Sequence, residues 1–125
     1  FNFEKQIVKD TMNKKNCYLN AGVYVMDLQR YRQEHIREKI GRLIVAHSKS
    51  KIWKFGVHQS SFILAVYNNT QVIDARWNKL QLGWNKNLKP EELREAFVLH
   101  WNGERKPWKQ DGLYREYWRQ YAANP

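Results

Sequence analysis

The stretch LHWNGERKPW at residues 99–108 carries the groups best suited to hold a charged ligand. A histidine, a glycine and a lysine follow at three-residue steps, as His100, Gly103 and Lys106, and a Pro-Trp pair closes the stretch. A neutral imidazole can bind Mn²⁺ or another divalent ion, a glycine lets the backbone approach an anion, and an ammonium group suits phosphate. The residues alone weigh this site about evenly against a hairpin-like loop closed by the Pro-Trp pair. One histidine is not a metal site, so its partner ligands have to come from outside the stretch.

The elements around this stretch are predicted from the spacing of apolar residues. Helices are expected at residues 3–12, over about twenty residues from Leu28, and at 58–69, 89–97 and 113–121, although the run at 58–69 also fits a buried strand. Strands are expected at 23–28, within 70–80 and at 97–101. His100 would then end a strand before a glycine turn, where α/β sheets present ligand-binding loops. No repeat or linker divides the chain, which predicts one α/β unit.

The charge of the chain favours an anionic partner. A formal net charge of +10 over 125 residues suits nucleic acid, a membrane surface or a phosphorylated small molecule. The basic residues form no block and show no zinc-finger spacing, which makes nucleic acid the second choice. That alternative is a basic module for nucleic acid or acidic glycans, with four tryptophans as stacking platforms: Trp53, Trp84, Trp101 and Trp108. No apolar run approaches about eighteen residues, so no transmembrane helix is expected within this sequence.

Three smaller features bear on the cellular context. The sequence opens with FNFEKQIVKD, without a methionine, and is expected to be part of a longer chain. Cys17 is the single cysteine; it cannot form an internal disulfide and is expected to be a core thiol. Asn68, Asn69 and Thr70 form an N-glycosylation sequon, which matters only if the protein enters the secretory pathway.

Several motifs together resemble the C-terminal half of family 8 glycosyltransferases. They are NAG at residues 20–22 followed by VYVMDL, HQ at 58–59, RWN after VID, and LHWNGERKPW, in the same order and at similar spacing. The similarity covers essentially the whole chain, and CYLNAGVYVMDL, QLGW and LHWNGERKPW resemble most the animal glycosyltransferase 8 domain-containing proteins. The resemblance implies an α/β fold of the GT-A type, a mixed sheet flanked by helices. Residues 1–125 would form its acceptor-side half, with the nucleotide-binding half upstream.

The resemblance also implies the chemistry of a retaining transferase that moves a hexose or pentose from a UDP-sugar to a glycan or protein acceptor. Mn²⁺ or another divalent ion would be held by an Asp-x-Asp pair and the histidine that matches His100. The residues matching Gly103 and Lys106 would contact the diphosphate. A departing UDP gains negative charge, and a divalent cation with a lysine is a physically sound way to stabilise it.

The sugar side of the implied site involves another set of residues. Asn20 and Ala21 would bind the donor sugar, and Gln59 would lie near the anomeric carbon, so Asn20 and Gln59 are the catalytic candidates. The amide of Gln59 has no titratable proton, which suits a positioning role and a front-face mechanism better than general-base catalysis. His58 would also contact the donor, although many family members have an acidic residue at that position.

Two departures from the family pattern qualify these expectations. No Asp-x-Asp occurs in the 125 residues, so the chain alone is expected to be inactive and the remaining metal ligands to lie upstream. A histidine at position 58 cannot accept sugar hydroxyls as a carboxylate does, which keeps a catalytically degenerate, transferase-like scaffold as a third alternative. The family resemblance further implies a Golgi-lumen enzyme with a type II membrane anchor upstream, and no nucleic-acid partner.

Overall fold

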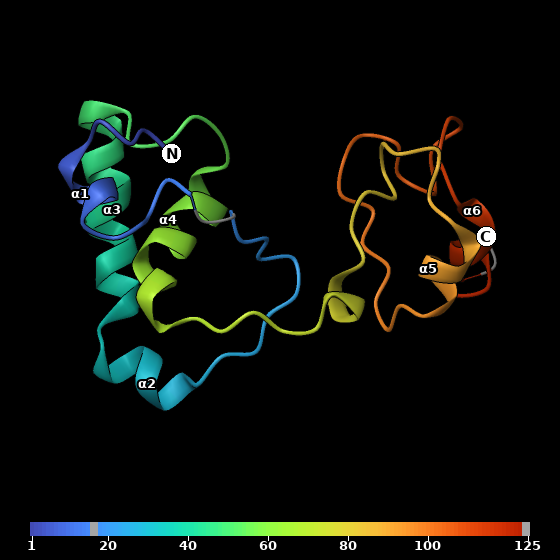
Figure 1. Cartoon of the computed structure of the whole chain (residues 1–125), viewed down its shortest axis with the longest axis horizontal. Helices are drawn as coiled ribbons and strands as arrows, with labels where there is room; N and C mark the ends of the chain where they lie inside the picture. The colour runs from blue at the N-terminus through green and yellow to red at the C-terminus, as the bar shows by residue number, and fades with distance from the viewer. Residues whose placement is uncertain (16–17, 124–125) are drawn as a thin grey trace. The chain divides into compact units, whose positions relative to one another are not determined.

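The computed structural model describes residues 1–15 and 18–123 and divides into two compact units (Figure 1). The first unit is Phe1–Val72 and the second is Ile73–Pro125, and each is described by itself. Cys17 lies outside the described residues, so its expected place in a core stays a prediction. The expectation that residues 1–125 are the acceptor-side part of one transferase domain also stays a prediction.

The first unit is helical. Its elements are α1 (Gln6–Lys9), α2 (Leu28–Gln33), α3 (Ile36–Ser50), α4 (Val57–Val66) and the 3₁₀ helix η1 (Tyr67–Asn69). Helices α3 and α4 pack against each other, and α1 contributes to the same core. The buried residues of this core are Val8, Met12, Leu43, Ile52, Trp53, Ile63 and Leu64. Burial of these apolar side chains is the main force that holds α1, α3 and α4 together.

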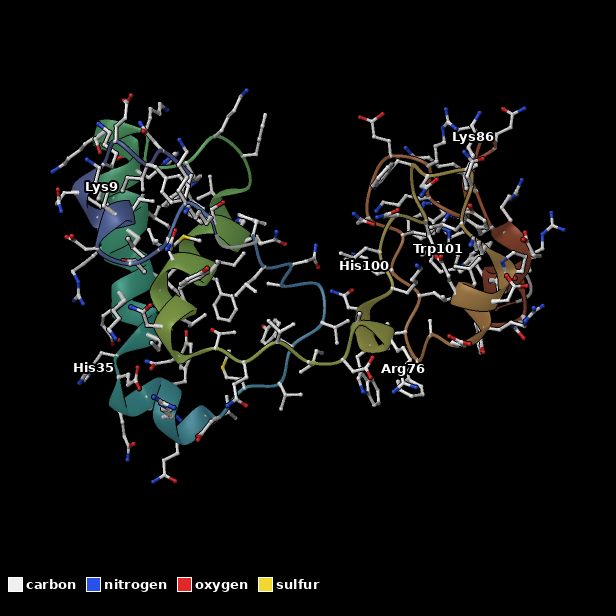
Figure 2. The ribbon with its side chains drawn as sticks, in the orientation of Figure 1. Lys9, His35, Arg76, Lys86, His100 and Trp101 are labelled. Carbon is white, nitrogen blue, oxygen red and sulfur yellow. The ribbon has the colours of Figure 1, made fainter. Side chains whose placement is uncertain are left out.

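The long helix predicted from Leu28 is in fact two helices. Asp27 caps the start of α2, because its carboxylate accepts a 2.9 Å hydrogen bond from the backbone N–H of Arg30. The chain then turns at His35, whose φ of 51° is left-handed and incompatible with a continuing α-helix. Figure 2 shows the side chain of His35 at this junction, where it is exposed. The predicted residues are therefore mostly helical, but the prediction of one continuous helix was wrong.

Two other helix predictions are confirmed at α4 and α5. The run at 58–69 forms α4 and η1, and it is not a strand. Gly56 precedes α4 with a φ of 66°, a conformation that glycine adopts without strain. In the second unit α5 (Pro90–Arg94) has proline at its start and Glu91 and Glu92 in its first turn, as the helix dipole favours. The helices predicted at 3–12 and 113–121 are shorter, and are α1 and α6 (Arg115–Arg119).

The second unit consists mainly of turns held by backbone hydrogen bonds, with the 3₁₀ helix η2 (Ala75–Asn78) near its start. Leu82 and Pro107 are fully buried and form the centre around which the turns at 81–85 and 100–106 close. Tyr114 joins two parts of this unit, because its hydroxyl donates to the Asn85 carbonyl and accepts from the Leu88 N–H, both at 2.9 Å. The unit is therefore fixed by polar contacts as much as by apolar ones.

The predicted mixed sheet is not formed by the part of the chain that the structure describes. A single isolated parallel bridge joins Lys79 to Leu99, and the segments 23–28, 70–74 and 97–101 form no extended ladder. A strand needs a partner that satisfies its backbone N–H and C=O groups. The side chain of Val25 is 91% exposed, so the alternation of apolar residues at 23–28 has neither a paired strand nor a core face. Within the described residues, no helix is long and apolar enough to span a membrane.

Candidate functional site

The turn at residues 100–106 packs edge to edge on the turn at 81–85. The Gly83 N–H donates to the Asn102 carbonyl at 3.1 Å, and the Arg105 N–H donates to the Gly83 carbonyl at 3.0 Å. Gly103 has a φ of 107°, and a Cβ placed there would lie 2.9 Å from both the Gly83 carbonyl oxygen and Cδ1 of Trp84. Only glycine fits this position, so the His-x-x-Gly-x-x-Lys motif is tied to the QLGW motif by contact.

His100 is held on both its backbone and its ring. Its N–H donates to the Lys79 carbonyl at 2.9 Å, and its Nδ1 lies 2.8 Å from Oδ1 of Asn78. Because an amide oxygen accepts, the Nδ1–H tautomer is favoured and leaves a lone pair on Nε2. Partial burial, and then the charge of Lys106, lower the pKa of His100 below its usual value. The half-buried ring, labelled in Figure 2, is thus neutral near pH 7, which is the state that binds a metal ion.

Lys106 has a structural contact in addition to its charge. Its ammonium group donates to the carbonyl of Trp101, and the half-buried side chain folds back over the turn. The indole N–H of Trp101 in turn donates to the Leu113 carbonyl at 2.8 Å, which fixes the segment that Lys106 caps. An ammonium group has three donors, so this contact leaves two for an anion.

The donor set around His100 fits one metal ligand and no more. Across residues 1–15 and 18–123, no group of three or more His, Cys, Asp or Glu side chains could hold a metal ion. A ring nitrogen oriented by an amide oxygen on its other nitrogen is the arrangement that metal-binding histidines use. His100 therefore suits a divalent ion whose remaining ligands come from elsewhere.

The Asn-Ala-Gly motif forms a turn in the first unit. Oδ1 of Asn20 accepts from the Gly22 N–H at 2.8 Å, which closes an Asx turn around the half-buried Ala21. Tyr18 links this segment to α4, because its hydroxyl lies 3.3 Å from both Nε2 of Gln59 and Oγ of Ser60. The structure thus joins the start of α4 to the motif through Tyr18.

His58 and Gln59 both lie in the first turn of α4 but face different surroundings. His58 is exposed, and its backbone carbonyl accepts from Oγ of Ser61 at 3.1 Å. Gln59 is half-buried beside Tyr18, with its amide N–H₂ engaged there. Only Gln59 is therefore positioned by side-chain contacts, whereas the imidazole of His58 extends into solvent.

The predicted site residues form two separate sets. Asn20, Ala21, His58 and Gln59 belong to the first unit, whereas His100, Gly103 and Lys106 belong to the second. Within each unit the motifs are brought together, by Tyr18 in one case and by the contact of two turns in the other.

Two positioning residues were missed from sequence. Asn78 belongs to RWN, and its amide meets the His100 ring; Tyr18 stands two residues before Asn20. The sequence offered one signal for Asn78, since RWN was among the motifs that carried the resemblance. It offered a signal of the same kind for Tyr18, which stands within CYLNAGVYVMDL.

The four proposed tryptophan platforms are not equivalent. Trp53 is 4% exposed and stacks on His47 with ring centroids 4.0 Å apart, so it is a core residue and its assignment as a platform was wrong. Trp101 is half-buried with its indole N–H bonded, whereas Trp84 and Trp108 are exposed. The structure therefore removes one of the four stacking surfaces that a nucleic-acid module would use.

Comparison with known proteins identifies the family. The family model described as glycosyl transferase family 8 matches residues 1–112, which include the Asn-Ala-Gly turn, the start of α4 and the whole turn from His100 to Lys106. The chain belongs to glycosyl transferase family 8. Membership implies the GT-A nucleotide-sugar transferase fold and confirms the resemblance carried by the motifs.

Relatives come from plants and animals. The chain is 30% identical to "Probable galacturonosyltransferase 14" of Arabidopsis thaliana over 98% of the chain and 24% of the relative. It is 37% identical to "Probable galacturonosyltransferase-like 8" of the same plant over 76% of the chain and 25% of the relative. It is 25% identical to "Glycosyltransferase 8 domain-containing protein 2" of Macaca fascicularis over 95% of the chain and 36% of the relative. The chain thus spans between about a quarter and a third of these relatives, and a search of solved structures finds no significant match.

Proposed function

We propose that this chain is the acceptor-side part of a retaining, metal-dependent glycosyltransferase that moves a hexose or pentose from a UDP-sugar to a glycan or protein acceptor. The observation that carries the proposal is the His100 ring, neutral and oriented by Asn78, in the same turn as Lys106. Family membership supports transferase activity in general, and the names of several relatives support a galacturonosyl donor in particular.

The second unit would bind the diphosphate. Nε2 of His100 would ligate Mn²⁺ or another divalent ion together with an Asp-x-Asp upstream of Phe1, and the ion would supply charge neutralisation for the leaving UDP. Lys106 would use its remaining donors on a diphosphate oxygen, where it stabilises the negative charge that grows as the glycosidic bond breaks. Gly103 would let the backbone of the turn approach the phosphates without a side chain between them.

The first unit would bind the donor sugar. Gln59, restrained by Tyr18, would present its amide oxygen toward the anomeric carbon, and Asn20 and Ala21 would contact the sugar from the Asx turn. An amide cannot take a proton at neutral pH, so these residues orient the donor and the reaction proceeds on one face of the sugar. The exposed His58 would offer one ring N–H and one acceptor nitrogen to the donor sugar, in place of the two acceptor oxygens of an acidic residue.

The same proposal sets the cellular context. A family 8 enzyme of this kind would act in the Golgi lumen, held by a type II membrane anchor outside this chain. Asn68 lies exposed in η1, directly after α4, where it can carry an N-linked glycan.

Transfer by the full-length protein tests the function. The protein is incubated with a panel of UDP-sugars, UDP-galacturonate included, with Mn²⁺ or with a chelator, and released UDP is quantified by chromatography. We expect UDP release from one donor, dependent on Mn²⁺ and reduced at least about a hundredfold by Gln59→Ala, since a misplaced donor loses that much. His35→Ala is the matched control, because His35 is an exposed histidine of the same unit that no predicted site includes. A folded protein that binds no UDP-sugar would instead be the degenerate scaffold.

A further inference from the structure

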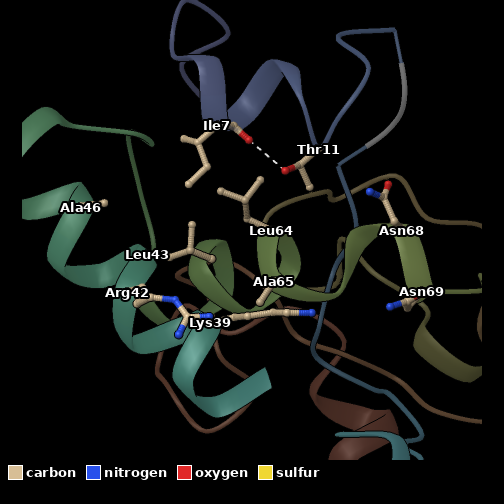
Figure 3. Close-up of a pocket in the computed structure, with 10 residues that line it drawn as sticks. All are labelled: Ile7, Thr11, Lys39, Arg42, Leu43, Ala46, Leu64, Ala65, Asn68 and Asn69. Atoms are coloured by element: carbon tan, nitrogen blue, oxygen red, sulfur yellow. Dashed lines mark hydrogen bonds between the residues drawn. The ribbon is translucent and has the colours of Figure 1, made fainter. Parts of the chain in front are cut away.

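Helix α4 has different neighbours at its two ends. Near its C-terminal end, Leu64 and Ala65 line the pocket among α1, α3, α4 and η1 that Figure 3 shows. In its first turn, Gln59 and Ser60 instead meet Tyr18, from the segment that leads into the Asn-Ala-Gly turn. The end of α4 that carries a predicted catalytic residue is therefore held by polar side-chain contacts.

Three side chains and one backbone carbonyl form a continuous hydrogen-bonded chain at this end of α4. Oγ of Ser60 lies 2.8 Å from the Phe55 carbonyl oxygen. The Tyr18 hydroxyl lies 3.3 Å from Oγ of Ser60 and 3.3 Å from Nε2 of Gln59. Ser60 is only 2% exposed, and the Tyr18 ring packs on Phe1 with ring centroids 5.5 Å apart. Water therefore has little access to the Ser60 hydroxyl, and packing restrains the Tyr18 ring.

The direction of each hydrogen bond in this chain follows from the number of protons. A carbonyl oxygen only accepts, so the single hydroxyl proton of Ser60 is donated to Phe55. Ser60 then accepts from Tyr18, and this bond uses the single hydroxyl proton of Tyr18. The Tyr18 oxygen remains as an acceptor, so Gln59 has to turn its N–H₂ group toward it. The amide oxygen Oε1 of Gln59 is thus the end that faces away from Tyr18.

The two ends of a side-chain amide have opposite electrostatic effects on a reacting sugar. Its oxygen carries partial negative charge and stabilises the positive charge that develops at an anomeric carbon as the leaving group departs, whereas its N–H₂ group opposes that charge. Because the charge is largest in the transition state, the orientation of the amide affects turnover more than substrate binding. A residue that fixes the orientation of Gln59 would therefore control the rate without touching the substrate.

We propose that Ser60, acting through Tyr18, is a positioning residue that determines which end of the Gln59 amide faces the donor sugar. The inference rests on the proposed function, in which Gln59 lies near the anomeric carbon, and it adds a residue that none of the predicted site residues includes. Without the Ser60 hydroxyl, the proton of Tyr18 is free to be donated to Oε1 of Gln59. The amide then rotates by half a turn at no loss of hydrogen bonds to Tyr18, and its N–H₂ group faces the donor.

The direction of the hydrogen bonds is tested on the full-length protein without any transfer step. The glutamine side chains are labelled with ¹⁵N, and the N–H₂ signals of Gln59 are identified by their loss in Gln59→Ala. We expect these NMR signals to shift in Ser60→Ala and in Tyr18→Phe, because each change removes the bond that holds the N–H₂ group. Ser61→Ala is the matched control and should leave them in place. Ser61 is also buried in the same turn of α4, but its hydroxyl donates to the His58 carbonyl at 3.1 Å.

Steady-state kinetics with the donor that the protein uses test the positioning role. Ser60→Ala and Tyr18→Phe should each lower kcat at least about tenfold and change KM less than about threefold, because a misoriented dipole acts mainly in the transition state. Ser61→Ala should leave both constants unchanged. The double variant should have the kcat of Tyr18→Phe alone, because Ser60 acts only through the hydroxyl that this change removes. Thermal melts of each variant verify folding.

Three results would overturn the proposal: unshifted Gln59 signals in Ser60→Ala, equal losses of kcat from Ser60→Ala and Ser61→Ala, or additive losses in the double variant. Failure of the proposed function gives a different pattern. The wild-type protein would then turn over none of the UDP-sugars, while the Gln59 signals would still respond to Ser60→Ala and not to Ser61→Ala. That pattern would uphold the orientation of the Gln59 amide by Ser60 and overturn the transferase function.

Discussion

Replacement of three glycines by alanine separates the packing of the candidate turn from its backbone conformation. Gly103 combines a φ of 107° with a Cβ position 2.9 Å from the Gly83 carbonyl oxygen, Gly56 has a φ of 66° with open space around it, and Gly41 has open space within α3. Alanine would thus meet both backbone strain and steric overlap at Gly103, backbone strain alone at Gly56, and neither at Gly41.

The expected changes in the free energy of unfolding follow from these differences. A left-handed φ costs an alanine about 1–2 kcal/mol, and overlap with packed atoms adds about 1–3 kcal/mol. Gly103→Ala should therefore destabilise the second unit by about 2–5 kcal/mol and Gly56→Ala the first by about 1–2 kcal/mol. Gly41→Ala should stabilise the first unit by about 1 kcal/mol, because alanine favours a helix interior.

Urea unfolding with two probes distinguishes the units. Five of the six tryptophans lie after Val72, so fluorescence reports mainly the second unit, whereas the helical circular dichroism signal comes mainly from α3 and α4. Gly103→Ala should shift the fluorescence transition, and the two other changes should shift the dichroism transition. An unshifted fluorescence midpoint in Gly103→Ala would refute the close contact between the turns at 81–85 and 100–106.

Three further predictions concern charge, orientation and modification. Hydrogen bonds from Arg76 lower the pKa of Asp74 from 3.8 to about 2. The stabilisation from this carboxylate is therefore present above pH 3.8 and lost as the pH falls through 2. Urea unfolding should show Asp74→Asn less stable than the wild type above pH 3.8 and equally stable at the acid end of this range. Asn78→Ala removes the amide that orients the His100 ring, and it should weaken Mn²⁺-dependent UDP binding by about ten- to a hundredfold, as loss of an outer-shell partner does. Asn78→Asp keeps an acceptor at this position, so calorimetry should show UDP affinity close to that of the wild type. Asn68 should carry a glycan when the full-length protein is made in a secretory host, and a mass spectrum with that site wholly unmodified would contradict the proposed compartment.

Helices were predictable because their signals are local. The proline and two glutamates at the start of α5 favour a helix with little help from distant residues, whereas the apolar run of α4 fitted a buried strand as well as a helix. The break at His35 was not predictable, because the apolar spacing continues through it and only the backbone φ reveals the turn. Strand predictions failed at 23–28 for the opposite reason, since a strand depends on a partner that its own sequence does not contain.

The candidate site was predictable in its residues but not in its connections. His100, Gly103 and Lys106 stand within one motif, so their proximity followed from spacing alone. The contacts that hold them were not visible in the sequence: the Asn78 amide lies 22 residues before His100, and the Lys106 ammonium is bonded to the Trp101 carbonyl. Long-range hydrogen bonds of this kind have no periodic signature, which is why Asn78 and Tyr18 emerge only from the structure.

The activity of the 125-residue chain alone follows from the proposed division of the site. Because no Asp-x-Asp occurs in the sequence, the purified chain should neither hydrolyse nor transfer from any UDP-sugar. Metal-dependent turnover by this chain would contradict the proposal that the nucleotide-binding half lies upstream.

Calorimetric titration of UDP at two Mn²⁺ concentrations tests the central claim most directly. In the full-length protein, His100→Ala removes one metal ligand, so raising Mn²⁺ should recover part of the UDP affinity by mass action. Lys106→Ala removes a charge-assisted contact worth about 1.5–3 kcal/mol, so UDP should bind about ten- to a hundredfold more weakly at both Mn²⁺ concentrations. Thermal melts run beside the titrations establish that each variant is folded. If the folded variants bind UDP as the wild type does, the turn from His100 to Lys106 has only a structural role and the assignment of the diphosphate site is wrong.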